Sequence, residues 1–169
     1  MNTANRSSIR YLSACMVIAT ALVSESPATA AAPDFTVVFA AGTACNFILQ
    51  IDGSGGNSHI KEFTDKNGNV VRSIQAGTGS ALSFTNIATG NTVSTRSNGA
   101  ISHITFNPDG SQTQMLTGHN VLILFLTDNP PGPSTTLIVG RVVFTVDGNG
   151  VFNVREVSGN RTDICAALS

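Results

Sequence analysis

From Phe35 onward, apolar and polar residues alternate with a period of two in one segment after another. In the first of these segments, Leu49 and Ile51 flank the polar Gln50. Successive side chains of a strand point to opposite faces, so the pattern is typical of strands with one solvated face. The alternation predicts an all-β chain with strands at 46–51, 82–85, 103–106 and 152–155.

Two further segments are mostly apolar at consecutive positions, 121–126 and 137–146, the second interrupted by Gly140 and Arg141. A strand that is covered on both faces has such a continuous apolar run. We therefore expect both segments to form central strands or strands covered on both sides.

Turn-forming residues separate these segments at intervals of about 8–12 residues, the spacing found in sandwiches and barrels. Asn-Gly and Asp-Gly pairs tolerate positive φ and suit tight hairpins. We expect hairpin turns at 65–69, 88–91, 107–110 and 147–150, loops at 53–57 and 128–134, and a short terminal turn at 163–168. About ten short strands would then form an antiparallel meander.

The first thirty residues have the three regions of a secretory signal peptide. Arg6 and Arg10 are basic, residues 11–23 are mostly apolar or small, and 28–30 read Ala-Thr-Ala, a small-x-small cleavage pattern. A membrane anchor needs roughly 20 apolar residues, and this run ends sooner, at Glu25. We expect cleavage after Ala30, a single β-domain over residues 31–169, and secretion, with the cell surface as a possible place of attachment.

Charge and hydropathy exclude two kinds of partner for that domain. Residues 31–169 contain seven basic and nine acidic side chains, which are scattered along the sequence. Nucleic-acid binding requires a concentrated basic face, so we expect no nucleic-acid partner. No later segment is long and apolar enough to span a bilayer, so we expect no membrane span after cleavage.

Cys45 and Cys165 are the two cysteines of the expected mature domain. Export places them where thiols oxidise, and an even pair in a secreted domain predicts a disulfide. Such a bond brings the first core strand close to the end of the chain, which is what closure of a sheet requires. We therefore expect a closed barrel, with a two-layer sandwich as the alternative.

No group of residues predicts catalysis, a metal or a cofactor. The segment 52–56 resembles the Gly-Asp-Ser-Gly-Gly of chymotrypsin-like proteases with its first two residues exchanged, and His59 lies too near Ser54 in the chain to reproduce their triad. We interpret it as a glycine loop. His59, His103 and His119 show no metal-ligand spacing.

The acidic residues likewise favour structural interpretations. Asp65 and Asp147 begin segments with oxygen ligands at alternate positions, but neither has the downstream acidic ligand of a calcium loop, so we predict hairpin turns. Glu62 and Glu156 lie on distant strands, and nothing in their spacing predicts a glycosidase pair.

Several short motifs together resemble a group of small secreted proteins of unknown function from actinobacteria. The resemblance spans most of 35–168 and implies export and a compact β-domain, but no activity. His119 stands where many of those proteins carry an arginine, so no role is transferred to it. The motifs are 45–47, 87–91, 99–104, 117–120, 147–150 and 159–165.

Three functions remain as hypotheses. The first is a non-enzymatic binding or cell-surface module, the second a barrel that carries a small apolar ligand, and the third an enzyme of unrecognised type. A carrier needs a cavity of about 300 Å³ or more, whereas inward side chains would fill a narrow barrel. The candidates for such filling are Phe39, Phe84, Phe106, Phe144 and Phe152.

Overall fold

The computed structural model describes residues 31–169, which form ten antiparallel strands in two sheets and one short helix. The predicted signal peptide, 1–30, lies outside the described residues. Across the described part of the chain, no helix has the length and apolar character needed to cross a membrane. The expectation of an all-β domain with about ten strands is confirmed.

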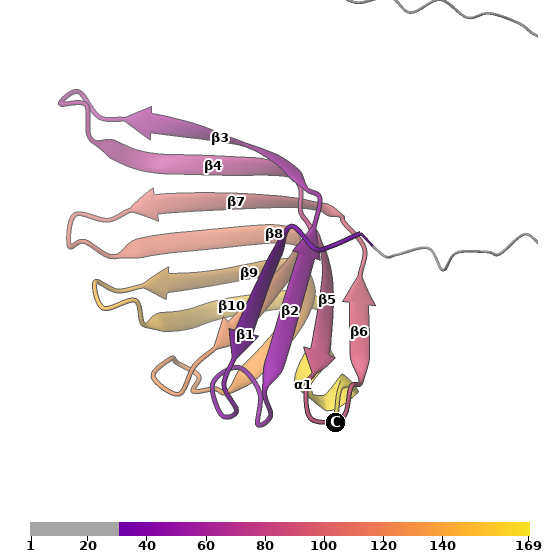
Figure 1. Cartoon of the computed structure of the whole chain (residues 1–169). Helices are drawn as coiled ribbons and strands as arrows, with labels where there is room; N and C mark the ends of the chain where they lie inside the picture. Colours follow the sequence, from indigo (N-terminus) through magenta and orange to yellow (C-terminus); the bar gives the residue numbers. More distant parts are fainter. Residues whose placement is uncertain (1–30) are drawn as a thin grey trace, which may run out of the picture. The chain divides into compact units, whose positions relative to one another are not determined.

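The smaller sheet has four strands in the order β1-β2-β5-β6, and the larger has six in the order β10-β9-β8-β7-β4-β3 (Figure 1). The smaller sheet comprises β1 (Phe35–Phe39), β2 (Leu49–Ser54), β5 (Ala81–Asn86) and β6 (Thr92–Thr95). The larger comprises β3 (Asn57–Thr64), β4 (Val70–Thr78), β7 (Gly99–Phe106), β8 (Gln112–Leu124), β9 (Ser134–Val146) and β10 (Phe152–Asp163). The helix α1 (Ile164–Ala167) follows β10 directly.

The first hydrophobic core lies between the two sheets. Leu49 and Phe84 of the smaller sheet are fully buried, and Val121 and Leu137 of the larger sheet pack against them. α1 contributes Ile164, and Asp163 caps the helix by accepting a hydrogen bond from the Ala166 amide at 3.0 Å. The expected terminal turn is therefore confirmed as one helical turn that covers the core.

The second core lies on the opposite face of β8, β9 and β10. Leu122 and Ile138 belong to it, although their neighbours Val121 and Leu137 face the first core. β8 and β9 thus carry apolar side chains on both faces, as their continuous apolar runs predict. The expectation of a doubly covered strand over all of 121–126 is wrong at its end, because β8 ends at Leu124 and Leu126 is 68% exposed.

A row of small residues, which we call the glycine row because four of its six members are glycine, crosses the whole six-stranded sheet with one residue from each strand. Direct register pairs connect its members in the order Ser58, Gly77, Ala100, Gly118, Gly140 and Gly159. A Cβ on Gly118 would lie 2.3 Å from the Gly99 carbonyl oxygen, so the two backbones approach too closely for any side chain. The row separates the segments of β8 and β9 that pack on the smaller sheet from the segments that extend beyond it.

The hairpin β3–β4 continues the larger sheet past the smaller one (Figure 1). Of the eight residues of β3, only Phe63 is half-buried and the others are exposed. Lys61 and Arg72 lie over the Phe63 ring, 5.3 and 4.2 Å from its centroid, and shield the ring partly from water.

The closed barrel that we expected is wrong, because neither sheet closes within residues 31–169. The predicted bond does join Cys45 to Cys165, with their Cα atoms 5.5 Å apart. However, Cys45 lies in the loop before β2 and Cys165 lies in α1, so the bond joins a loop to a helix and pairs no edge strands. Two separate sheets favour the sandwich alternative.

The simple meander is also wrong. β7, β8, β9 and β10 follow one another in both sequence and space, but β2 pairs with β5 because the hairpin β3–β4 joins the other sheet. The chain crosses between the sheets three times, at 55–56, 79–80 and 96–98. The predicted loop at 53–57 is correspondingly shorter, since β2 runs to Ser54 and Gly53 is buried within it.

Candidate binding site

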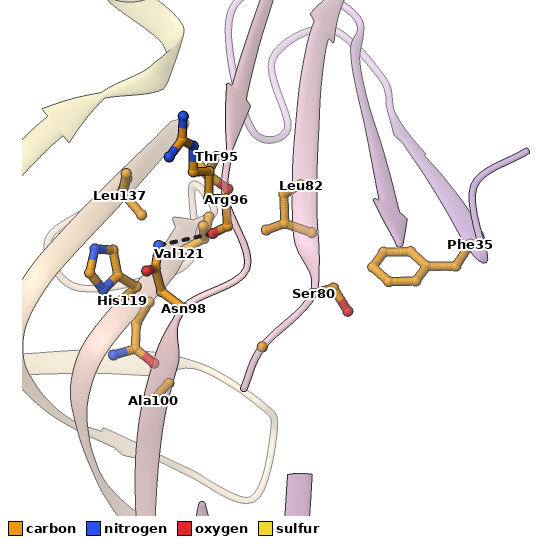
Figure 2. A pocket seen from close by; sticks show the side chains of 12 residues that line it. Phe35, Ser80, Leu82, Thr95, Arg96, Asn98, Ala100, His119, Val121 and Leu137 are labelled. Atoms are coloured by element: carbon orange, nitrogen blue, oxygen red, sulfur yellow. Dashed lines mark hydrogen bonds between the residues drawn. The ribbon is translucent and has the colours of Figure 1, made fainter. Parts of the chain in front are cut away.

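A cleft of about 360 Å³ opens between the two sheets at the end where the chain crosses from one to the other (Figure 2). It receives side chains from β1, β5 and β6 of the smaller sheet and from β7, β8 and β9 of the larger. The lining residues are Phe35, Gly79, Ser80, Leu82, Thr95, Arg96, Asn98, Ala100, His119, Asn120, Val121 and Leu137.

The floor of the cleft is apolar and continuous with the first core. Leu82, Val121 and Leu137 line the cleft and also pack against the buried residues of that core. These three side chains are only half-buried, because the sheets diverge here and leave one side of each open. An apolar molecule that entered the cleft would therefore extend the core and remove these side chains from water.

The rim of the cleft is built by the three crossing segments, which are hydrogen-bonded to one another. The Gly79 amide donates to the Asn98 carbonyl oxygen at 2.9 Å, and the Ser80 hydroxyl donates to the Gly55 carbonyl oxygen at 2.8 Å. The Ser97 hydroxyl also donates to the Gly79 carbonyl oxygen. These bonds connect the three crossing segments, so the rim is held by hydrogen bonds within the domain itself.

Two cation-forming side chains stand at the mouth, Arg96 after β6 and His119 on β8, and both are exposed. In the view of Figure 2, Leu82 lies between Phe35 on one side and Arg96 and His119 on the other. The dashed line in that figure is the bond from the Asn98 side-chain amide to the Arg96 carbonyl oxygen, 3.0 Å long. This bond fixes the backbone from which the guanidinium group extends.

Asn120 stands behind the mouth and has an unusual environment. Its side-chain nitrogen is buried and has no hydrogen-bond partner within residues 31–169. A buried donor that lacks an acceptor costs about 1–3 kcal/mol. Asn120 also lines a second hollow of about 180 Å³ with Ser58, Gln75 and Ser102, so its amide lies where the two spaces meet.

The structure separates the three histidines. His59 is on β3, His103 on β7 and His119 on β8, and only His119 lines the cleft. Within residues 31–169, no three histidine, cysteine or acidic side chains come together as metal ligands would.

The aspartates that we assigned to turns do occupy turns. Asp65 accepts hydrogen bonds from the Asn67 and Asn69 amides, and the Asn69 side chain and backbone hold the pKa of its carboxyl group below the usual value. Asp147 accepts equivalent bonds from the Asn149 and Val151 amides. Their oxygens therefore stabilise the hairpins themselves.

The residues of the protease-like segment do not form a catalytic triad. Asp52 is on β2, and hydrogen bonds from the Thr36 hydroxyl and then from the Gln50 amide lower the pKa of its carboxyl group. Ser54 ends β2, and His59 lies on β3 in the other sheet. The glycine loop between them is one of the three crossings.

Glu62 and Glu156 lie on β3 and β10, the opposite edges of the six-stranded sheet. Glu156 forms a salt bridge with Arg141, 3.2 Å between the nearest nitrogen and oxygen. The two glutamates therefore do not meet across one site.

Sequence reasoning did not identify the cleft, because it treated every turn as a hairpin between neighbouring strands. The crossings at 79–80 and 96–98 do carry turn-forming residues, Gly79-Ser80 and Ser97-Asn98. Those residue types announce a turn, but they do not say whether the next strand pairs with the previous one or joins another sheet.

Comparisons of the chain with protein-family models, with curated proteins and with solved structures find no match. The resemblance to small secreted actinobacterial proteins therefore stays a prediction, and the cleft carries the functional argument.

Proposed function

We propose that this domain is an exported binding module and that the cleft between its sheets holds a small amphipathic molecule. The observation that carries the proposal is the open apolar floor of Leu82, Val121 and Leu137 beneath a polar rim. A volume of about 360 Å³ is within the range of small-molecule sites, about 300–1,000 Å³, which typically combine apolar walls with a few placed polar groups.

This proposal joins two of the hypotheses drawn from the sequence. Secretion is predicted from the signal-peptide pattern and the resemblance, and a binding role is inferred because no group of residues in the sequence predicts catalysis, a metal or a cofactor. The apolar-ligand hypothesis placed its cavity inside a barrel. We now place the ligand between two sheets, where Phe84 and Phe144 are buried within the two cores and leave the cleft open.

Filling the floor of the cleft is expected to abolish binding. Val121→Phe adds a ring where the ligand would lie, and we expect it to weaken binding of the neutral dye Nile red at least tenfold. Residues 31–169 contain no tryptophan and no tyrosine, so a fluorescence titration has little protein background.

Val71→Phe is the matched control, because Val71 is 39% exposed on β4 and does not line the cleft. Circular dichroism checks that each variant folds, and Ser80→Leu at the rim replaces Val121→Phe if the latter unfolds. Dye binding that is equal in wild type, the control and the filled variants would refute the proposal.

Export is tested separately. We expect secreted protein whose N-terminus lies near Ala31, because residues 1–30 have the order of charge, apolar run and small residues that signal peptidase requires. Edman sequencing of protein from the culture medium measures this directly, and Ala30→Arg should block cleavage at the expected position. Secreted material that begins at Met1 would contradict the prediction.

A further inference from the structure

Two polar side chains of the cleft, Arg96 at its mouth and Asn120 behind the mouth, have donors without a partner in the described chain. Arg96 has only donors, and the unpartnered atom of Asn120 is a donor nitrogen. Neither the cleft nor the adjoining hollow has an aspartate or glutamate in its lining. A ligand that satisfied this site would have to bring acceptors.

We propose that the ligand is an amphipathic oxyanion, an apolar body with one carboxylate or phosphate head group bound by Arg96 and Asn120. The inference rests on the proposed function and names the chemical class of its ligand. The apolar body would cover the floor, and the head group would lie toward the mouth.

Arg96 supplies the charge. Within residues 31–169, the only salt bridge joins Arg141 to Glu156, so Arg96 has no carboxylate partner in the described chain. A guanidinium group offers paired donors that match the two oxygens of a carboxylate or phosphate. Its backbone is fixed by the bond from Asn98 and by the linked crossings, so the group stands ready at the rim.

Asn120 makes the site selective for ligands that bring a hydrogen-bond acceptor. Its buried nitrogen lacks an acceptor in the described structure, and a ligand oxygen placed there would remove the cost of leaving that donor unsatisfied. A neutral hydrocarbon covers the floor but leaves the nitrogen unpaired. An ammonium head group offers no acceptor and is repelled by Arg96.

Four ligands with the same eight-carbon chain separate these classes: octanoate, octyl phosphate, 1-octanol and octylammonium. Their affinities are measured by calorimetry and by displacement of Nile red from the mature protein. We expect octanoate or octyl phosphate to bind at least tenfold more tightly than octanol, and octylammonium to bind most weakly. The comparison of the first two decides which head group the site prefers.

Arg96→Gln removes the charge, and Arg155→Gln makes the same change at an exposed arginine on β10 outside the cleft. Asn120→Asp keeps the side-chain size but replaces the donor with an anionic acceptor. We expect Arg96→Gln and Asn120→Asp each to weaken binding of the preferred anion at least tenfold, and each to weaken octanol binding much less than anion binding. Arg155→Gln should match wild type.

The outcomes distinguish this inference from the proposed function. If octanol and Nile red bind as tightly as the anions, and Arg96→Gln changes nothing, the cleft binds apolar molecules and the head-group assignment is wrong. If wild type binds neither the dye nor any member of the series, both the proposed binding function and the assignment of an anionic head group are refuted.

Discussion

Removal of the disulfide by the double substitution Cys45→Ala, Cys165→Ala is expected to lower the free energy of unfolding by about 2–5 kcal/mol. The bond joins residues 120 positions apart, and a crosslink across so long a segment strongly restricts the unfolded chain. Alanine is the better replacement here, because Cys45 is fully buried in the first core and serine would bury a hydroxyl group there.

The neighbours of the bond explain why its loss should not abolish the fold. Ala44 and Leu168 are fully buried beside it, and the Thr135 hydroxyl donates to the Ala44 carbonyl oxygen at 3.0 Å. These contacts keep the loop before β2 and the helix α1 on the core when the covalent link is absent. The β-rich circular dichroism spectrum should therefore persist while the urea midpoint falls.

Oxidised and reduced wild type provide the matched comparison, since reduction breaks the bond without changing the sequence. Reduction should lower the urea midpoint in wild type and leave the double variant unaffected. Equal midpoints for all forms would mean that the bond contributes nothing to stability. Two reactive thiols in the purified, unreduced protein would mean that the bond does not form.

The sequence predicts the parts of this fold that depend on residues close together in the chain, and it does not predict the parts that depend on distant residues. Alternation along a strand and the residues of a tight turn are local, and they correctly predicted strands within β2, β5, β7 and β10 and the turn that Asp65 stabilises. Even the disulfide followed from a count of cysteines and the predicted export. None of these local patterns indicates which of the two sheets a strand joins.

Assignment of strands to sheets depends on contacts between distant residues. Nearly all of β3 is exposed, because the smaller sheet does not reach it, and no local pattern shows how far another sheet extends. The cleft arises for the same reason. Leu82 is on β5, His119 is on β8 and Arg96 is in the crossing after β6, and only the crossings between the sheets bring them together.

The glycine row gives the second large expected effect, because it determines how closely the strands of the larger sheet approach. Gly118 has φ of +93°, a conformation that costs a residue with a side chain about 1–2 kcal/mol. An added Cβ would also lie 2.3 Å from the Gly99 carbonyl oxygen, so β7 and β8 would have to separate. We expect Gly118→Ala to lower the free energy of unfolding by about 2–4 kcal/mol.

Gly148→Ala is the control for this substitution. Gly148 lies in the β9–β10 turn with a φ outside the left-handed range, and nothing lies within 4 Å of the position that its Cβ would occupy. Urea unfolding followed by circular dichroism should show a near-neutral effect there. Equal midpoints for Gly118→Ala and Gly148→Ala would contradict the close approach of β7 and β8.

Gly118→Ala also tests whether the shape of the cleft depends on the close packing of β7 against β8. Gly118 precedes His119, Asn120 and Val121 on β8, so any separation of β7 from β8 moves the three side chains that line the cleft from that strand. Gly118→Ala should therefore weaken Nile red binding under conditions where the variant is still folded, whereas Gly148→Ala should bind as wild type does. A destabilised Gly118→Ala that binds the dye normally would show that the cleft does not depend on the register of the glycine row.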